Sequence, residues 1–439
     1  MEWFALLVLV LILAKCGAEL WLEHLNRKHV LAHAKEIPAA FRAVMDPSTY
    51  ARAVDYTLAK GRLTRVELCF SAVLLLAALY SGVLPWAFGK VAAAFGTAPW
   101  AMTSYLFLVG ITFSVAGMWL DWYQQFRLEE RFGFNTTSQK LWWLDRLKGL
   151  LLAMALGWPL LWLILKFVEW TGAWWWFWAW AALLFFQLLM AVLAPVVIMP
   201  IFNKFTPLPS GSLRDRLLQL AERTRFRAQS IQVMDGSKRS RHSNAFFTGF
   251  GRFRKIVLFD TLVQQLAEPE LESVLAHEIG HFKKKHIPKM LVVSALGSLF
   301  AFFVVSWLAQ QSWLYHAFGF NQGSIVPALL LFGLLGGLVS FWFSPLTHRW
   351  SRRWEYEADA FAAEAMKGGR SLVGALRKLT EKNLSNLTPH PIYSAFYYSH
   401  PRLLERESAL AAIKPFQTEA TRRADGASCT TQTQFSPPN

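Results

Sequence analysis

The sequence predicts an all-α membrane protein with seven transmembrane helices and a small α+β domain on one side of the bilayer. Of its 439 residues, 54% are hydrophobic, and they include 21 Trp and 35 Phe. The apolar residues form several uninterrupted runs of about twenty residues, the length that crosses the hydrocarbon core. The basic residues collect in alternate connections between these runs, as they do in membrane proteins of fixed orientation. A soluble protein of this size would not normally contain such runs.

Seven runs are expected to span the membrane. The first begins directly after Met1-Glu2-Trp3 and has neither a basic region before it nor a cleavage site after it, so it is expected to stay as a span. The runs lie at about 4–22, 66–88, 100–120, 149–168, 174–197, 290–309 and 325–345.

The charge of the connections predicts the orientation. The first and third connections are rich in Lys and Arg, the second has only Lys90, and the stretches 169–173 and 310–323 have none. Positively charged loops stay in the cytoplasm, so we expect the N-terminus outside, the C-terminus inside and the fifth connection in the cytoplasm. The net charge of +16 is explained by this topology, and no nucleic acid is expected as a partner.

The fifth connection is expected to hold the α+β domain. Its residues predict a helix over 213–224 and strands over 230–234, 244–248 and 254–259, followed by a further helix. The whole chain then divides into 1–197 with five spans, 198–289 as a metal-binding core, 290–345 with two spans, and 346–414 as the C-terminal part of that core. The tail over 415–439 is rich in Thr, Ser and Pro and is expected to be disordered.

The helix that follows the strands carries His277-Glu278-Ile279-Gly280-His281. Positions four apart share a helix face, so His277 and His281 can offer two imidazole nitrogens to one zinc ion. Glu278 is rotated by about 100° and can reach a water on the metal as the general base for peptide hydrolysis. The alternative is a solvated amphipathic helix with two idle histidines. The three cysteines are far apart, so the remaining protein ligand is expected to be a carboxylate.

The best donor of that carboxylate lies after the last predicted span. Glu355 and Asp359 are four apart on one helix face, whereas Glu357 points away from it. If Glu355 binds zinc, Asp359 can accept the outward N–H of a ligand histidine. The alternative is an acidic helix paired with Arg352 and Arg353.

Two further polar clusters lie near the membrane boundaries. His400, followed by Arg406, could stabilise the anionic tetrahedral intermediate of peptide hydrolysis. Asn244 begins a strand whose edge could pair with an extended peptide. Taken alone, each is more often an ordinary loop residue than a functional one. His286 is about 140° from the ligand face, so it is expected to cap the helix end and not to bind the metal.

Together these motifs resemble the integral-membrane CAAX prenyl protease family, which consists of zinc metalloendopeptidases with seven membrane helices. The resemblance covers about 50–410 and rests on an ordered set of blocks: 129–137, 199–209, 240–249, 277–286, 355–362 and 399–401. One departure is Arg402, which stands where the family often has a second proline.

The resemblance implies a ring of tilted helices around a water-filled chamber that the zinc site faces. It implies one zinc ion per chain, a membrane-associated or prenylated protein or peptide as substrate, and a monomer. The membrane would be the inner membrane of a bacterium or the endoplasmic reticulum of a eukaryote. In this sequence the implied roles fall on His277, His281 and Glu355 as zinc ligands, Glu278 as base, Asp359 as the partner of a ligand histidine, His400 with Arg406 behind it at the oxyanion, and Asn244 at the substrate.

Two other functions stay open at this point. A heat-shock-type membrane metalloprotease for protein quality control would share the zinc motif but usually has fewer spans. A non-catalytic transporter or receptor would also suit seven helices. Transporters usually place isolated charges within their spans, and the only one here is Lys15.

Overall fold

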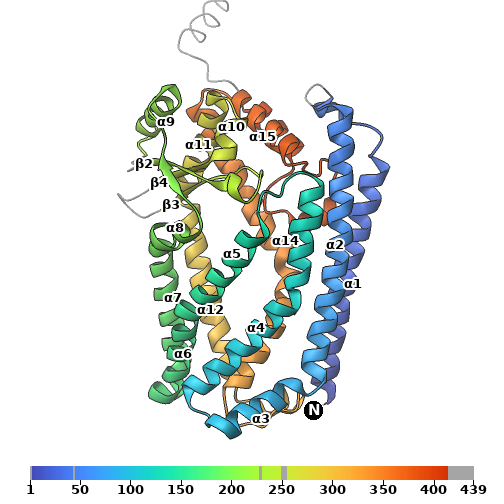
Figure 1. Cartoon of the computed structure of the whole chain (residues 1–439), viewed down its shortest axis with the longest axis vertical. Coiled ribbons are helices and arrows are strands. Elements are labelled where there is room, and N and C mark those ends of the chain that lie inside the picture. Colours follow the sequence, from blue (N-terminus) through green and yellow to red (C-terminus); the bar gives the residue numbers. More distant parts are fainter. Residues whose placement is uncertain (1, 43–44, 227–229, 249–254, 414–439) are drawn as a thin grey trace, which may run out of the picture.

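The computed structural model describes residues 2–42, 45–226, 230–248 and 255–413. The predicted disordered tail over 415–439 lies outside these residues. Long helices run along the length of the molecule, and a small sheet with its flanking helices lies at one end (Figure 1). The short helix α3 (Val83–Phe95) lies at the opposite end.

The N-terminal helices are longer than the predicted spans. They are α1 (Glu2–Ala32), α2 (Pro47–Tyr80), α3 (Val83–Phe95) and α4 (Pro99–Tyr123). Asp46 fixes the start of α2, because its side chain accepts hydrogen bonds from the backbone N–H groups of Ser48 and Thr49. The predicted span 66–88 is wrong at its end: α2 stops at Tyr80, because Gly82 takes a left-handed conformation with φ 77° and α3 begins after it.

Six helical stretches of the described chain are long and apolar enough to cross a membrane. They are Trp3–Ala32, Pro47–Tyr80, Pro99–Glu129, Gln139–Phe202, His286–Leu308 and Val326–Ala365. The fourth contains both predicted spans 149–168 and 174–197. Within it, α5 (Gln139–Leu152) and α6 (Trp158–Thr171) lead to Gly172, whose φ of 54° breaks the helix, and α7 (Trp175–Leu193) then packs against α6 before the short α8 (Met199–Phe202). The count of seven crossings therefore stays a prediction.

The sheet has the strand order β1-β2-β4-β3. The strands are β1 (Phe205–Pro207), β2 (Ser230–Met234), β3 (Ala245–Thr248) and β4 (Lys255–Phe259). β2 and β4 are parallel, and the two outer strands pair antiparallel to their neighbours. The three predicted strands are present within one residue of their expected bounds. β1 has no sequence signal, because it has only three residues, too few for an alternating pattern, and ends in proline.

Three helices flank the sheet: α9 (Ser212–Arg223), α10 (Asp260–Gln265) and α11 (Glu268–Lys283). One face of α11 enters the core through Leu271, Leu275 and Ile279, which lie in the same buried cluster as Leu217 of α9 and Ile256 of β4. This burial fixes the rotation of α11 about its axis, and the histidines then lie on the face turned toward the C-terminal helices.

The C-terminal part consists of α12 (His286–Leu308), α13 (Ser312–His316), α14 (Val326–Ala365), α15 (Arg370–Lys382), α16 (Pro391–Tyr397) and α17 (Leu403–Ala412). The prediction of a span over 325–345 followed by a separate helix is wrong, because α14 continues without a break through Pro345. Proline removes one backbone donor but does not always end a helix. The apolar part of α14 and the segment with Glu355 and Asp359 are thus one rigid element.

Candidate metal centre

The site forms where α11 and α14 approach each other closely. At the contact lies Gly280, and a Cβ atom built on it would be 2.9 Å from the Cα and 3.0 Å from the carbonyl oxygen of Ala358. Real Cβ atoms do not approach a backbone this closely, so this position requires glycine. The contact brings the Glu355 turn of α14 beside the face of α11 that carries His277 and His281.

The side chains of His277, His281 and Glu355 converge on one point. The two Nε2 atoms are 3.2 Å apart. Glu355 Oε1 is 3.2 Å from Nε2 of His281, and Glu355 Oε2 is 3.5 Å from Nε2 of His277. Two ligands of a tetrahedral zinc ion, each about 2.0–2.1 Å from it, lie roughly 3.4 Å apart. The spacing of the three donors therefore fits one tetrahedral ion, and no other group of three such residues among the described ones was found to fit.

The hydrogen bonding of Glu355 also points to a cation. This side chain is buried, and its Oε2 atom has no hydrogen-bond partner among the residues that the structure describes. A buried carboxylate oxygen without a partner is costly, because it has lost its water. A divalent cation between the two imidazoles and this oxygen would remove that cost.

The His277 ring is held from behind by Asp359 and Arg406. Its Nδ1 atom lies 2.8 Å from Asp359 Oδ1, the contact expected from the sequence. Arg406 donates from Nε and Nη2 to the same carboxylate, at 2.8 and 2.5 Å. Burial alone would lower the pKa of His277, but the carboxylates of Asp359 and Glu355 outweigh burial and raise this pKa to about 9. A metal ion that binds this ring therefore displaces a proton.

The His281 ring is held by a different set. Its Nδ1 atom lies 3.0 Å from Nδ1 of His286, and Nε2 of His286 lies 3.1 Å from Glu357 Oε2. His286 is 3% exposed and stacks on Trp354, with ring centroids 5.1 Å apart and planes 11° apart. His286 therefore does not cap α11, as the sequence suggested, but contacts a candidate ligand.

Sequence reasoning missed this partner. His286 faces the site because Lys285 adopts a left-handed conformation, φ 57°, between α11 and α12 and reverses the chain there. Glycine or asparagine usually marks such a turn, and lysine gives no signal of it.

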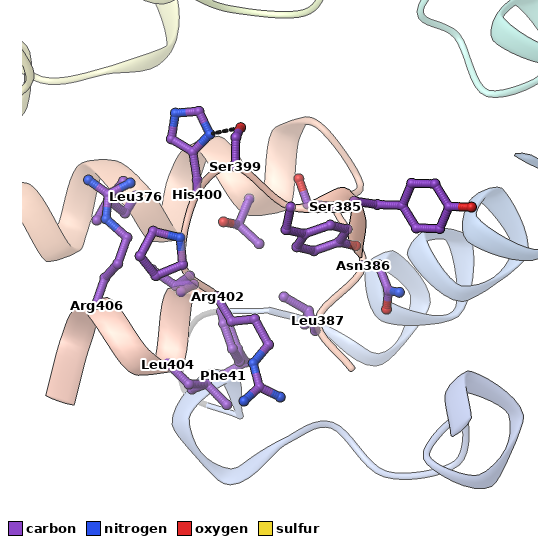
Figure 2. A pocket seen from close by; sticks show the side chains of 15 residues that line it. Phe41, Leu376, Ser385, Asn386, Leu387, Ser399, His400, Arg402, Leu404 and Arg406 are labelled. Carbon is purple, nitrogen blue, oxygen red and sulfur yellow. Dashed lines mark hydrogen bonds between the residues drawn. The ribbon is translucent and has the colours of Figure 1, made fainter. Parts of the chain in front are cut away.

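Glu278 and His400 lie on the accessible side of the centre. Glu278 lines a cavity of about 770 Å³ together with His281 and Ser399, and burial raises the pKa of its carboxyl. The His400 side chain is 66% exposed, and its Nε2 atom is 3.4 Å from Glu355 Oε1. The hydroxyl of Ser399 lies 3.0 Å from Nδ1 of His400 (Figure 2).

Arg406 lies beside the converging donors, and Asn244 lies on the sheet. Arg406 is buried, and its guanidinium is hydrogen-bonded to Asp359 and lies 3.6 Å from Glu355 Oε2. Asn244 is exposed at the start of β3, where its side-chain oxygen accepts from the N–H of Ala245. β3 is the outer strand of the sheet, and Phe246 on it lines the same cavity as Glu278.

Two family models cover nearly the whole chain. Residues 26–204 match the model described as the CAAX prenyl protease N-terminal region with five membrane helices, and residues 207–414 match peptidase family M48. The first model ends directly before β1, and the second begins at Pro207, the last residue of that strand.

Individual relatives agree with these models. CAAX prenyl protease 1 of Saccharomyces cerevisiae is 40% identical over 307 residues, which cover 66% of this chain and 68% of the yeast protein. The Arabidopsis thaliana homologue is 34% identical over 386 residues, 85% of this chain and 90% of that protein. The crystal structure of S. mikatae Ste24p superposes with a TM-score of 0.85 at 32% identity and covers 93% of this chain and 99% of that one.

These likenesses do not favour a transporter, a receptor or a heat-shock-type protease. They cover both the membrane helices and the segment with the candidate ligands. The chain belongs to the CAAX prenyl protease 1 family within peptidase family M48, and it is a membrane metalloendopeptidase.

Proposed function

We propose that this protein is a zinc endopeptidase that cleaves CAAX-type, prenylated or otherwise membrane-associated proteins. The proposal rests on one observation above all, the convergence of His277, His281 and Glu355, in which a buried oxygen of Glu355 has no hydrogen bond among the described residues. The relatives named CAAX prenyl proteases support the substrate class.

In this proposal His277, His281 and Glu355 hold the metal. Zinc, when bound, supplies a Lewis acid that polarises the peptide carbonyl and makes water more acidic. Glu278 takes the proton of the attacking water and passes it to the leaving amine nitrogen. The raised pKa of Glu278 supports this role, because it brings the carboxyl closer to the pH at which both transfers occur.

The other predicted residues act on the substrate or on the ligands. His400 donates a hydrogen bond to the developing oxyanion, since its exposed Nε2 atom lies beside Glu355. Asn244 holds the backbone of a peptide that lies extended along the outer edge of β3. Arg406 keeps Asp359 ionised and in place, and Asp359 in turn orients His277.

For the membrane, we propose seven crossings around a water-filled chamber, with the N-terminus outside and the α+β domain and the C-terminus in the cytoplasm. The membrane is the inner membrane of a bacterium or the endoplasmic reticulum of a eukaryote. We propose a monomer, which is supported by the origin of all three candidate ligands in one chain.

The variant Glu278→Gln tests the reaction. General acid–base catalysis contributes about 10²–10⁴-fold, so cleavage of a farnesylated CAAX peptide is expected to fall at least that far while one zinc ion per chain stays bound. Glu222→Gln, at an exposed position of α9, is the matched control and is expected to cleave like the wild type. Wild-type cleavage by Glu278→Gln, or loss of zinc from it, would contradict the role of Glu278 as base.

A further inference from the structure

An apolar cavity leads away from the metal centre. It has a volume of about 770 Å³, which is within the usual range of small-molecule sites. Glu278, His281 and Ser399 line it near the centre, and Thr347, His348 and Ser351 of α14 add polar groups elsewhere in its wall. Most of the remaining wall comes from the first turns of α12, from α14 and from aromatic side chains beside α11, and includes Phe282, Ile287, Met290, Leu291, Trp350 and Trp354.

Several residues of the cavity wall are exposed on α12 and α14. Ile287, Met290 and Val293 line the cavity and are also 47%, 56% and 44% exposed on α12, and Trp350 on α14 is 49% exposed. α12 is one of the stretches able to cross a membrane, and its exposed side is apolar beyond the cavity at Val292 and Leu296. The cavity thus joins an exposed apolar face of α12 to the side chain of Glu278.

We propose that this cavity binds the isoprenoid chain of a prenylated substrate. The inference rests on the proposed function. A prenyl chain is attached to the cysteine of the C-a-a-X motif, so it must lie close to the peptide that is cut. The cavity meets this need, because Glu278 and His281 of the metal centre line one part of it and the exposed apolar face of α12, a helix able to cross a membrane, lines another.

The apolar and polar parts of the lining favour an isoprenoid chain over other occupants. The occupant must be apolar along most of its length and joined to a peptide at the Glu278 end. A bilayer lipid would place its charged headgroup at one end of the apolar wall, and an apolar side chain of an unmodified peptide would leave most of the cavity unfilled. An isoprenoid chain bound in this cavity is removed from water, which removes the cost of exposing it.

Cleavage kinetics of a variant whose cavity is filled by a larger side chain test the proposal. Leu291 is half-buried in the cavity wall, and its neighbour Val292 is 58% exposed and does not line the cavity. We expect Leu291→Trp to raise KM for a farnesylated peptide by about tenfold, because pocket contacts discriminate by such factors. The kcat/KM for the same peptide without the farnesyl group is expected to stay within about twofold of wild type. Val292→Trp is the matched control and is expected to change neither peptide.

Two results of this experiment would overturn the proposal. Leu291→Trp slows both peptides equally if the cavity serves the peptide and not the lipid. It slows neither if the cavity is not used. Zinc content is measured in every variant, so that damage to the metal centre is recognised.

Photolabelling keeps the proposal testable without turnover. A farnesylated peptide whose isoprenoid carries a diazirine is bound to Glu278→Gln and irradiated. Labels are expected on Met290, Leu291 or Trp350. Labels in the separate cavity of about 500 Å³ that is lined by Tyr56 and Tyr393 would overturn the inference, as would a label that excess phospholipid displaces. If the wild type cuts no peptide, the proposed function fails, and the labelled residues still decide which cavity binds the chain.

Discussion

The two candidate ligand histidines are placed alike, but different side chains hold them in position. Both turn Nε2 toward the shared point and bond Nδ1 to a partner. His277 is supported by a buried charged pair, Asp359 and Arg406. His281 is supported by an imidazole, His286, and only through it by Glu357, whose side chain is 32% exposed.

The partners fix the protons on these rings. Asp359 accepts from Nδ1–H of His277, so the proton that a metal displaces from this ring is the one on Nε2. Glu357 accepts from Nε2–H of His286, so Nδ1 of that ring is free to accept from Nδ1–H of His281. Every donor then meets an acceptor in both sets. The two sets differ in how they respond to the loss of a partner. Removing one charge of the Asp359–Arg406 pair leaves the other buried and unpaired, whereas the His286–Glu357 set loses only part of its hydrogen bonding.

Asp359→Ala is expected to have the largest effect. It leaves Arg406 as a buried cation without its partner and His277 without an acceptor. Loss of such second partners lowers metal affinity by about 10–100-fold, and breaking a buried ion pair costs about 3–5 kcal/mol of folding stability. Zinc titration and thermal unfolding measure the two losses. Unchanged zinc affinity would show that Asp359 does not act on His277.

Gly280→Ala is expected to disturb both histidines together. The new methyl group meets the backbone of Ala358 and forces α11 and α14 apart, which costs about 1–3 kcal/mol. Zinc affinity should fall along with stability, since Glu355 moves away from both rings. Gly297→Ala is the matched control, because a Cβ there meets nothing within 4 Å. Equal behaviour of the two variants would exclude the close helix contact as the origin of the site.

His286→Leu is expected to lower zinc affinity by about tenfold, at the smaller end of the range for such partners. The variant fills the buried space but leaves the N–H of His281 without an acceptor. His286→Asn restores an acceptor oxygen and should recover most of the affinity, which a purely structural role would not predict. The account of His281 fails if the leucine and asparagine variants bind zinc equally well.

Glu357→Gln is expected to have the smallest effect, about two- to threefold in zinc affinity. The amide oxygen still accepts from His286, and the lost charge is partly exposed and also paired with Arg353 at 3.3 Å. Isothermal titration of zinc into the metal-free variant measures this change. If Glu357→Gln lowers zinc affinity as much as Asp359→Ala does, the partners of His277 and of His281 do not differ in importance.

The sequence predicted those parts of the site whose geometry follows from helix periodicity. The spacing of four placed His277 and His281 on one face and Glu355 with Asp359 on another, and the structure has both pairs where they were expected. It could not show that the two faces meet, because that depends on the contact of Gly280 with Ala358, which is far away in the chain.

The features of the fold that the sequence did not predict also depend on contacts between distant segments. α14 passes through Pro345 because its neighbours hold it, and β1 exists because β2 offers it an edge. Neither fact has a local sequence signal. His286 was missed for the related reason that a lysine, and not a glycine, makes the turn before it.

The central claim is that two histidines of α11 and one glutamate of α14 bind a single zinc ion. X-ray absorption at the zinc edge of the purified wild-type protein tests it most directly. The account predicts one zinc per chain with two imidazole nitrogens and a carboxylate oxygen at about 2.0–2.2 Å. Protein without stoichiometric zinc, or with a sulfur ligand at about 2.3 Å, would contradict it.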